Sequence, residues 1–179
     1  MPSSINASGD AVANALGQLL YKIGHLSPVL AVLGEDMVER VKRRFAAATS
    51  PTGVPWRPNT AVTLANYIRS RGGISKKTGK MLAKGKALAA AKRPLQGRSG
   101  ALARQIFSAV TQTDTGDALT MGSTMRYARM QHAGGTKAMW KHLWGDIPAR
   151  PFMPLTPTGE LERTEEDLIV EGIRQYITS

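Results

Sequence analysis

The sequence predicts an α+β fold with N-terminal helices, a small antiparallel sheet, a C-terminal helix and a basic flexible insertion at about residues 72–98. Apolar residues recur at helical spacing over the first 48 residues and again near the end of the chain. Between these segments, residues 103–122 alternate apolar and polar side chains, which is typical of half-buried strands. Helices followed by strands and a further helix indicate an α+β protein.

The 179 residues are expected to form one domain, residues 1–179. A chain of this length buries about 70% of its unfolded surface and needs neither a disulfide nor a metal for stability. There is no cysteine, which excludes disulfides, thiolate metal ligands and cysteine nucleophiles. No segment reaches the roughly 18 apolar residues of a membrane helix, and residues 1–10 lack a secretory-signal pattern. We therefore expect folding in a cytoplasm and no membrane partner.

Two helices are expected in tandem at the N-terminus. Residues 10–24 are amphipathic, and Ser27-Pro28 is a typical N-cap with a first-turn proline for a second helix that ends near Ala48. Residues 50–58 hold three prolines and predict a loop around Trp56. Trp56 is expected to fold back onto the core as a structural plug, with a binding role as the alternative. A short helix follows over residues 60–71.

The basic insertion is rich in Lys, Gly and Ala, and we expect it to be an exposed arm with a weak helix over residues 84–93. Beyond it, strands are expected over residues 103–113 and 117–122, and a short helix over 124–132. Residues 147–155 predict an extended edge strand interrupted by prolines. Thr164 is expected to cap the final helix, whose first turn is acidic.

The net charge of +11 is unevenly distributed. Between Glu39 and Asp114 there are 16 Lys and Arg and no acid, whereas residues 160–171 hold six acids and one Arg. A contact with a polyanion or with a partner protein is therefore expected of the basic segment, whose candidate residues are Lys76, Lys77, Lys80, Lys84, Lys86, Lys92, Arg93 and Arg98. The segment has no aromatic residue for base stacking, which favours a protein partner over direct DNA contact.

No catalytic residue, metal site or cofactor is expected. Gly79-Lys80 does not fit a phosphate-binding loop, because the glycine spacing is wrong and Met81 follows the lysine. A metal site would have to use His132, His142 and Asp146, and the spacing of the histidines matches no known ligand pattern. No pair of carboxylates stands out for acid–base catalysis.

A set of short motifs recurs in a recognisable order along the chain. It comprises the loop Pro51-x-Gly53-x-x-Trp56, Ser99-Gly100-Ala101-Leu102, Met121-Gly122-Ser123-Thr124, Tyr127-Ala128, Gln131-His132-x-Gly134 and Ile147-Pro148-Ala149-Arg150-Pro151-Phe152. In this order the motifs resemble the virion morphogenesis (tail-completion) family of Mu-like phages and, more broadly, head–tail neck proteins.

The last motifs supply the candidate contacts between copies or with partners, which are Tyr127, His132, Pro148, Arg150, Pro151 and Phe152. Pro148 and Pro151 remove backbone donors and hold the segment extended. Arg150 between them is expected to bind a carboxylate of a neighbouring copy, or alternatively to form a salt bridge within its own copy.

The resemblance implies a structural, non-enzymatic virion protein located in the tail or neck. It implies a ring, with six copies expected, that contacts the tail tube or tail terminator and the head connector, and that can surround genomic DNA. The alternative is a basic accessory protein that binds nucleic acid without sequence specificity.

Overall fold

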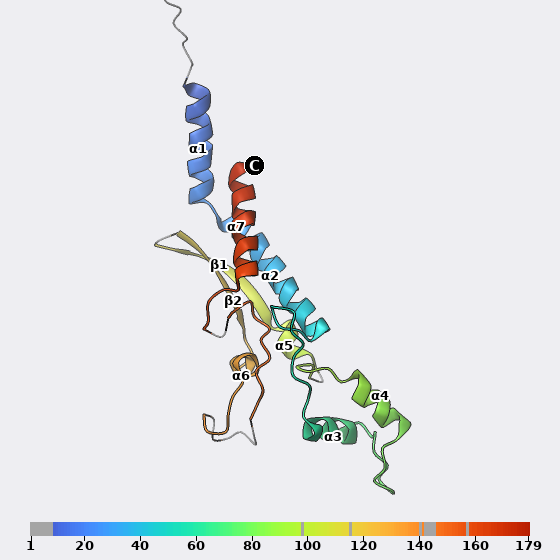
Figure 1. Cartoon of the computed structure of the whole chain (residues 1–179). Helices are drawn as coiled ribbons and strands as arrows, with labels where there is room; N and C mark the ends of the chain where they lie inside the picture. Colours follow the sequence, from blue (N-terminus) through green and yellow to red (C-terminus); the bar gives the residue numbers. More distant parts are fainter. Residues whose placement is uncertain (1–8, 98, 115, 140, 142–145, 157) are drawn as a thin grey trace, which may run out of the picture. The chain divides into compact units, whose positions relative to one another are not determined.

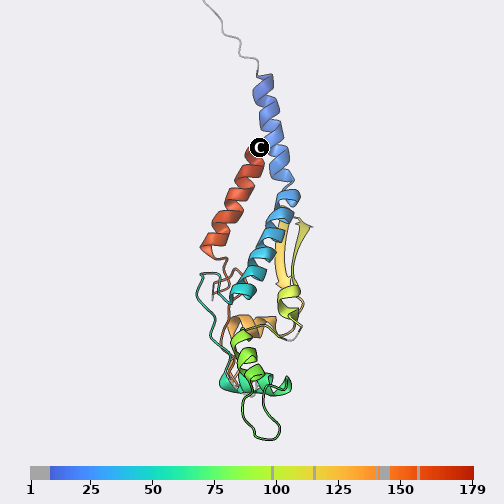
Figure 2. The same cartoon turned by 90° about the vertical axis from the view of Figure 1, so that its right-hand side faces the viewer.

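The computed structural model describes residues 9–97, 99–114, 116–139, 141, 146–156 and 158–179. Figure 1 shows the elements in chain order, and Figure 2 shows them from a direction turned by 90°. They are α1 (Asp10–Gly24), α2 (Ser27–Ala47), α3 (Ala61–Ser70), α4 (Ala83–Ala91), α5 (Ala101–Arg104), β1 (Ile106–Thr113), β2 (Gly116–Ser123), α6 (Ala128–Ala133) and α7 (Arg163–Thr178). The two strands form one antiparallel sheet, which confirms the predicted α+β class.

The chain divides into two compact units. Unit 1 comprises Met1–Val38, Phe107–Gly122 and Leu161–Ser179, so that it contains α1, the first half of α2, most of the sheet and α7. Unit 2 comprises Glu39–Ile106 and Ser123–Glu160, and it contains the end of α2 and helices α3 to α6.

In unit 1, α2 packs closely against both the sheet and α7. A Cβ on Gly34 would lie 2.7 Å from Leu119 Cδ1 and 2.9 Å from Ser108 Cβ, so only glycine allows this approach to the strands. On α7, a Cβ on Gly172 would lie 2.7 Å from Leu33 Cδ2. The first N–H of α2, at Ser27, donates to Asp117 Oδ2 of β2 at 2.7 Å, which satisfies a donor that has no partner within the helix.

Helix α1 contacts α7 mainly through polar groups. Lys22 Nζ donates to Ser179 Oγ at 3.4 Å, and the Tyr176 hydroxyl donates to His25 O at 2.9 Å, just beyond the end of α1. No residue of α1 is buried. Among the described residues no single helix has the length and apolar character to cross a membrane; α1 and α2 meet that criterion only as a pair bent by 49°.

An aromatic cluster forms the core of unit 2. The ring of Phe45 on α2 lies 5.4 Å from that of Trp56 and 5.1 Å from that of Phe152. Phe152 is 1% exposed and Trp56 is 6% exposed. Trp56 Nε1 donates to Pro151 O at 2.7 Å, so the one polar atom of the indole has a partner. The loop tryptophan therefore packs in the core and joins two segments that are distant in sequence.

The basic insertion has more regular structure than the sequence predicts. Residues 73–82 form a hairpin, closed by hydrogen bonds from Ser75 N to Lys80 O and from Leu82 N to Gly73 O, each 3.0 Å long. Helix α4 follows and lies beside α3 (Figures 1 and 2). A Cβ on Gly85 would lie 2.2 Å from Gly73 O, so the hairpin and α4 are in direct contact. The absence of side chains at Gly73 and Gly85 thus allows the hairpin to pack closely against α4, with Ile68 and Met81 beside the two glycines.

Two sequence predictions were wrong. Residues 147–155 do not form an edge strand: only Ile147 and Leu155 lie in isolated bridges, that of Ile147 being with Gly135, because the prolines interrupt any longer ladder. Thr164 does not cap α7, since the helix already begins at Arg163 and Glu162 occupies the N-cap position without a side-chain cap. The Glu162 carbonyl instead accepts the backbone N–H groups of Glu165 and Glu166.

Replacing Trp56 with alanine tests the aromatic core of unit 2. We expect Trp56→Ala to lower the free energy of unfolding by about 3–5 kcal/mol, because it removes a buried ring and leaves a cavity beside Phe45. Chemical denaturation measures the change. The control is Val54→Ala on the same loop, where the side chain is exposed and the expected change is about 0.5 kcal/mol or less. Equal effects of the two substitutions would contradict the core role of Trp56.

Candidate functional site

Residues 147–153 are held against α6 by their own backbone N–H groups. Arg150 N donates to Gln131 O at 3.0 Å, and the N–H groups of Phe152 and Met153 donate to His132 Nδ1 at 3.1 and 3.3 Å. Pro148 and Pro151 have no N–H, so they leave no donor unsatisfied in this irregular segment. The sequence motifs Gln131-His132 and Arg150-Pro151-Phe152 therefore meet in space and form one hydrogen-bonded unit.

Arg150 is buried within its own copy, where it donates to backbone carbonyls. It is 7% exposed, Nε donates to Arg57 O at 2.9 Å and Nη2 donates to Pro58 O at 3.1 Å. Within the copy, backbone carbonyls of the Trp56 loop take the place of the expected carboxylate. The contact with a carboxylate of a neighbouring copy stays a prediction. Burial lowers the pKa of Arg150 from its usual value, but arginine keeps its charge in proteins.

His132 acts as an acceptor through Nδ1. The two N–H groups that point at this atom require it to be unprotonated, so the proton of the neutral ring lies on Nε2. The ring also packs edge-on against Phe152, with centroids 5.1 Å apart. Burial of the ring lowers the pKa of His132 below its ordinary value of 6.5. Hydrogen bonding and burial thus both favour the neutral form.

A groove of about 720 Å³ brings several of the sequence-predicted residues together. Tyr127, Pro148, Arg150 and Lys92 line it, and further polar side chains around it include Thr60, Thr63, Ser99 and Gln131. Tyr127 is partly exposed at this groove, whereas Phe152 and His132 belong to the packed side of the segment. The lining is more apolar than polar and includes the Asp146 carboxylate, while Arg150 and Lys92 already donate to backbone carbonyls of the same copy.

The candidate basic residues separate into two groups. Lys92 and Arg93 are engaged within unit 2: Lys92 Nζ donates to Gln96 O and lies 5.0 Å from the centroid of the Tyr67 ring, and Arg93 donates to Ala46 O at the end of α2. Burial, together with the nearby Arg71 charge, lowers the pKa of Lys92. The other candidates are exposed on the hairpin and α4; they are Lys76, Lys77, Lys80, Lys84 and Lys86. Arg98 lies outside the described residues.

His132 uses Nδ1 to accept two backbone N–H groups, which leaves that nitrogen unable to act as a base. Within the described part of the chain, no group of three His, Asp or Glu side chains is placed to hold a metal ion. His142, the other histidine weighed as a ligand, lies outside the described residues.

The sequence analysis missed the acceptors of Arg150. They are backbone carbonyls of Arg57 and Pro58, and no residue type at those positions signals such a role. The pairing of His132 with residues 152 and 153 was equally hidden, because it uses backbone N–H groups.

Shortening the guanidinium of Arg150 is expected to destabilise the isolated chain. Arg150→Lys keeps the charge but cannot donate to both carbonyls in the same geometry, so we expect a loss of about 1–3 kcal/mol in the free energy of unfolding. Thermal or chemical denaturation measures it, with the exposed Arg126→Lys as control. An unchanged midpoint for Arg150→Lys would contradict an internal role and support an intermolecular one.

His132 is expected to make stability depend on pH. Because its pKa is lowered in the folded chain, the unfolded chain binds more protons in the range just below pH 6.5. The contribution of His132 to stability is therefore complete above pH 6.5 and decreases as the pH falls toward the folded-state pKa. Urea denaturation between pH 5 and 8 measures this effect. His132→Asn supplies an acceptor that does not titrate, and should flatten this part of the profile; an unchanged profile in this variant would refute the assignment.

Comparison with known proteins gave one match. The chain matches the phage virion morphogenesis family over residues 7–177, which includes α1 through nearly all of α7. No curated protein and no solved structure was found to match it. The match covers both compact units, the groove and the basic segment, and it agrees with the motif order in the sequence. The chain therefore belongs to the phage virion morphogenesis family and is a structural protein associated with the virion.

Proposed function

We propose that this protein completes the phage tail and forms a ring of identical copies at the head–tail junction, without catalytic activity. The observation that carries the proposal is the uncovered apolar face of α1. Val12, Leu16, Leu20 and Ile23 share one side of the helix and are 54–71% exposed. A contiguous exposed apolar face is typical of a surface that another protein covers.

The sheet of unit 1 supports the same proposal. It has two strands in the described structure, and each strand has an outer edge with no strand partner there. A two-stranded hairpin is marginal by itself and is stabilised by further packing. Neighbouring copies in a ring would supply packing for both α1 and the sheet, and a contact that repeats head to tail can close into such a ring.

The proposed partners follow from this position. One face of the ring would contact the tail tube or tail terminator, and the other the head connector, with genomic DNA passing through the centre. Six copies are the expected number for a ring attached to a tail tube. The groove beside Arg150 and Tyr127, whose lining is mainly apolar, is a candidate binding site for an extended segment of one of these proteins.

The apolar face of α1 provides the test. We expect Leu16→Glu combined with Leu20→Glu to abolish oligomers in native mass spectrometry and to leave heads and tails unjoined in infected cells, with an unchanged melting temperature because both side chains are exposed. The matched control, Asn14→Glu with Gln18→Glu, adds the same charge on another side of α1. Normal particle yield from the leucine variant would contradict the proposal.

A further inference from the structure

The two units carry net charges of opposite sign. Unit 2 contains 21 Lys and Arg against 3 Asp and Glu, which gives a net charge of +18. Unit 1 contains 3 Lys and Arg against 10 Asp and Glu, which gives −7. Each copy thus carries one positively and one negatively charged unit, which favours contact between oppositely charged units of different copies.

The hairpin of residues 73–82, here called the basic hairpin, displays the positive charge most openly. Lys76, Lys77 and Lys80 are exposed around its turn. Its backbone is held by the hydrogen bonds across the turn and by contact with α4, so the lysines belong to an ordered backbone segment. The hairpin also exposes two apolar side chains beside the lysines, Met81 at 50% and Leu82 at 43%.

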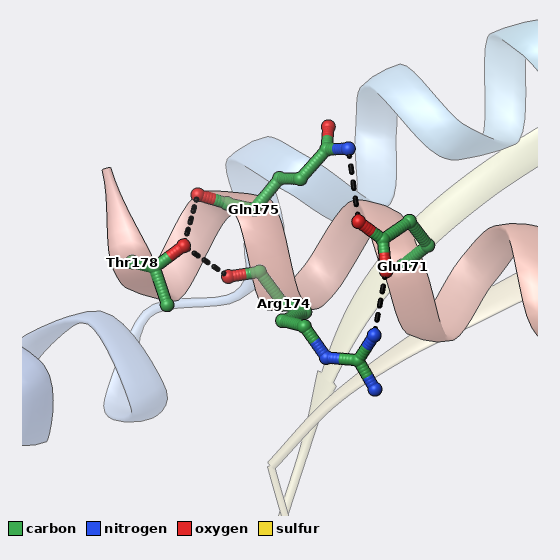
Figure 3. Close-up of polar contacts among 4 residues, drawn as sticks. All are labelled: Glu171, Arg174, Gln175 and Thr178. Atoms are coloured by element: carbon green, nitrogen blue, oxygen red, sulfur yellow. Dashed lines mark hydrogen bonds and ion pairs between the residues drawn. The ribbon is translucent and has the colours of Figure 1, made fainter.

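The start of α7 exposes negative charge, together with one apolar side chain. Glu166 and Asp167 are exposed, and Val170, one turn beyond Glu166, is 48% exposed. Farther along α7, Glu171 is already engaged: Arg174 Nη1 donates to it at 2.7 Å and Gln175 Nε2 at 3.1 Å (Figure 3). Glu166 and Asp167 are therefore open to a cation of another molecule.

We propose that the basic hairpin of one copy docks on the start of α7 of a second copy. Lys76 and Lys77 would face Glu166 and Asp167, while Met81 and Leu82 would cover Val170. The exposed apolar residues favour this occupant over nucleic acid, because a phosphate backbone offers nothing for them to pack against. The inference rests on the proposed ring and names the contact that repeats around it, in which two different surfaces meet.

Charge exchange tests the contact in the full-length protein. The hairpin reversal (Lys76→Glu with Lys77→Glu) and the α7 reversal (Glu166→Lys with Asp167→Lys) are each expected to raise the dissociation constant of the oligomer by about tenfold or more at low salt. Combining all four substitutions in one chain should bring the dissociation constant back to within about tenfold of the wild type, since the signs again match. The control, Lys137→Glu with Lys141→Glu, makes the same charge change elsewhere in unit 2. Sedimentation velocity measures the constants, and melting temperatures verify folding.

The results of these experiments distinguish failure of the proposed contact from failure of the proposed ring. Oligomers that persist in the hairpin reversal, or no rescue in the combined variant, would overturn the contact and leave the ring proposal standing. A wild-type chain that stays monomeric at every concentration would overturn both. If the hairpin reversal abolishes binding of random duplex DNA and leaves the oligomer intact, the hairpin binds nucleic acid and the proposed contact is wrong.

Discussion

Burial of Phe152 is the interaction on which unit 2 depends. Its ring contacts Phe45 from α2 and His132 from α6, and its carbonyl accepts from Arg44 Nη1 at 3.2 Å. Its N–H reaches His132 Nδ1. One residue thus connects two helices that are more than 80 residues apart in sequence. The prolines on this segment, and the buried Arg150 within it, serve the same purpose of holding Phe152 in place.

Much of the fold could be predicted from the sequence. Periodicity gave α1, α2, α3 and α7 within a few residues, and alternation gave both strands. The hairpin of residues 73–82 was missed because its apolar residues, Ile74, Met81 and Leu82, lie only at its two ends and do not alternate with polar ones; its contact with α4 depends on the approach of Gly73 to Gly85. The extended segment after Ile147 was mistaken for a strand because prolines favour extended backbone whether or not a neighbouring strand pairs with it.

The candidate site could be predicted in part. The motifs located the residues that line the groove or pack behind it, but they did not give the direction of Arg150, because its acceptors are backbone carbonyls. Lys92 and Arg93 are likewise indistinguishable in sequence from the lysines of the hairpin, and only tertiary contacts show that they are used within unit 2. Residue type therefore predicts which groups a side chain can bind, but it does not predict where that side chain points in the fold.

The two units differ in how completely their residues are packed within a single copy. Unit 2 has an aromatic core, and three of its polar side chains, those of Arg150, Trp56 and His132, have hydrogen-bond partners within the unit. Unit 1 keeps α1 without a single buried residue. In the proposed ring, unit 1 would gain packing for α1 from neighbouring copies, whereas the aromatic core of unit 2 is complete within one copy.

Hydrogen–deuterium exchange of the α1 backbone tests this account most directly. In the free protein, the account predicts fast exchange of residues 10–24 compared with α2, because no residue of α1 is buried in the described structure. In purified virions, the same amides should exchange more slowly by at least about tenfold, as a covered helix does. Equal exchange of α1 in the free protein and in virions would contradict the claim that assembly completes unit 1.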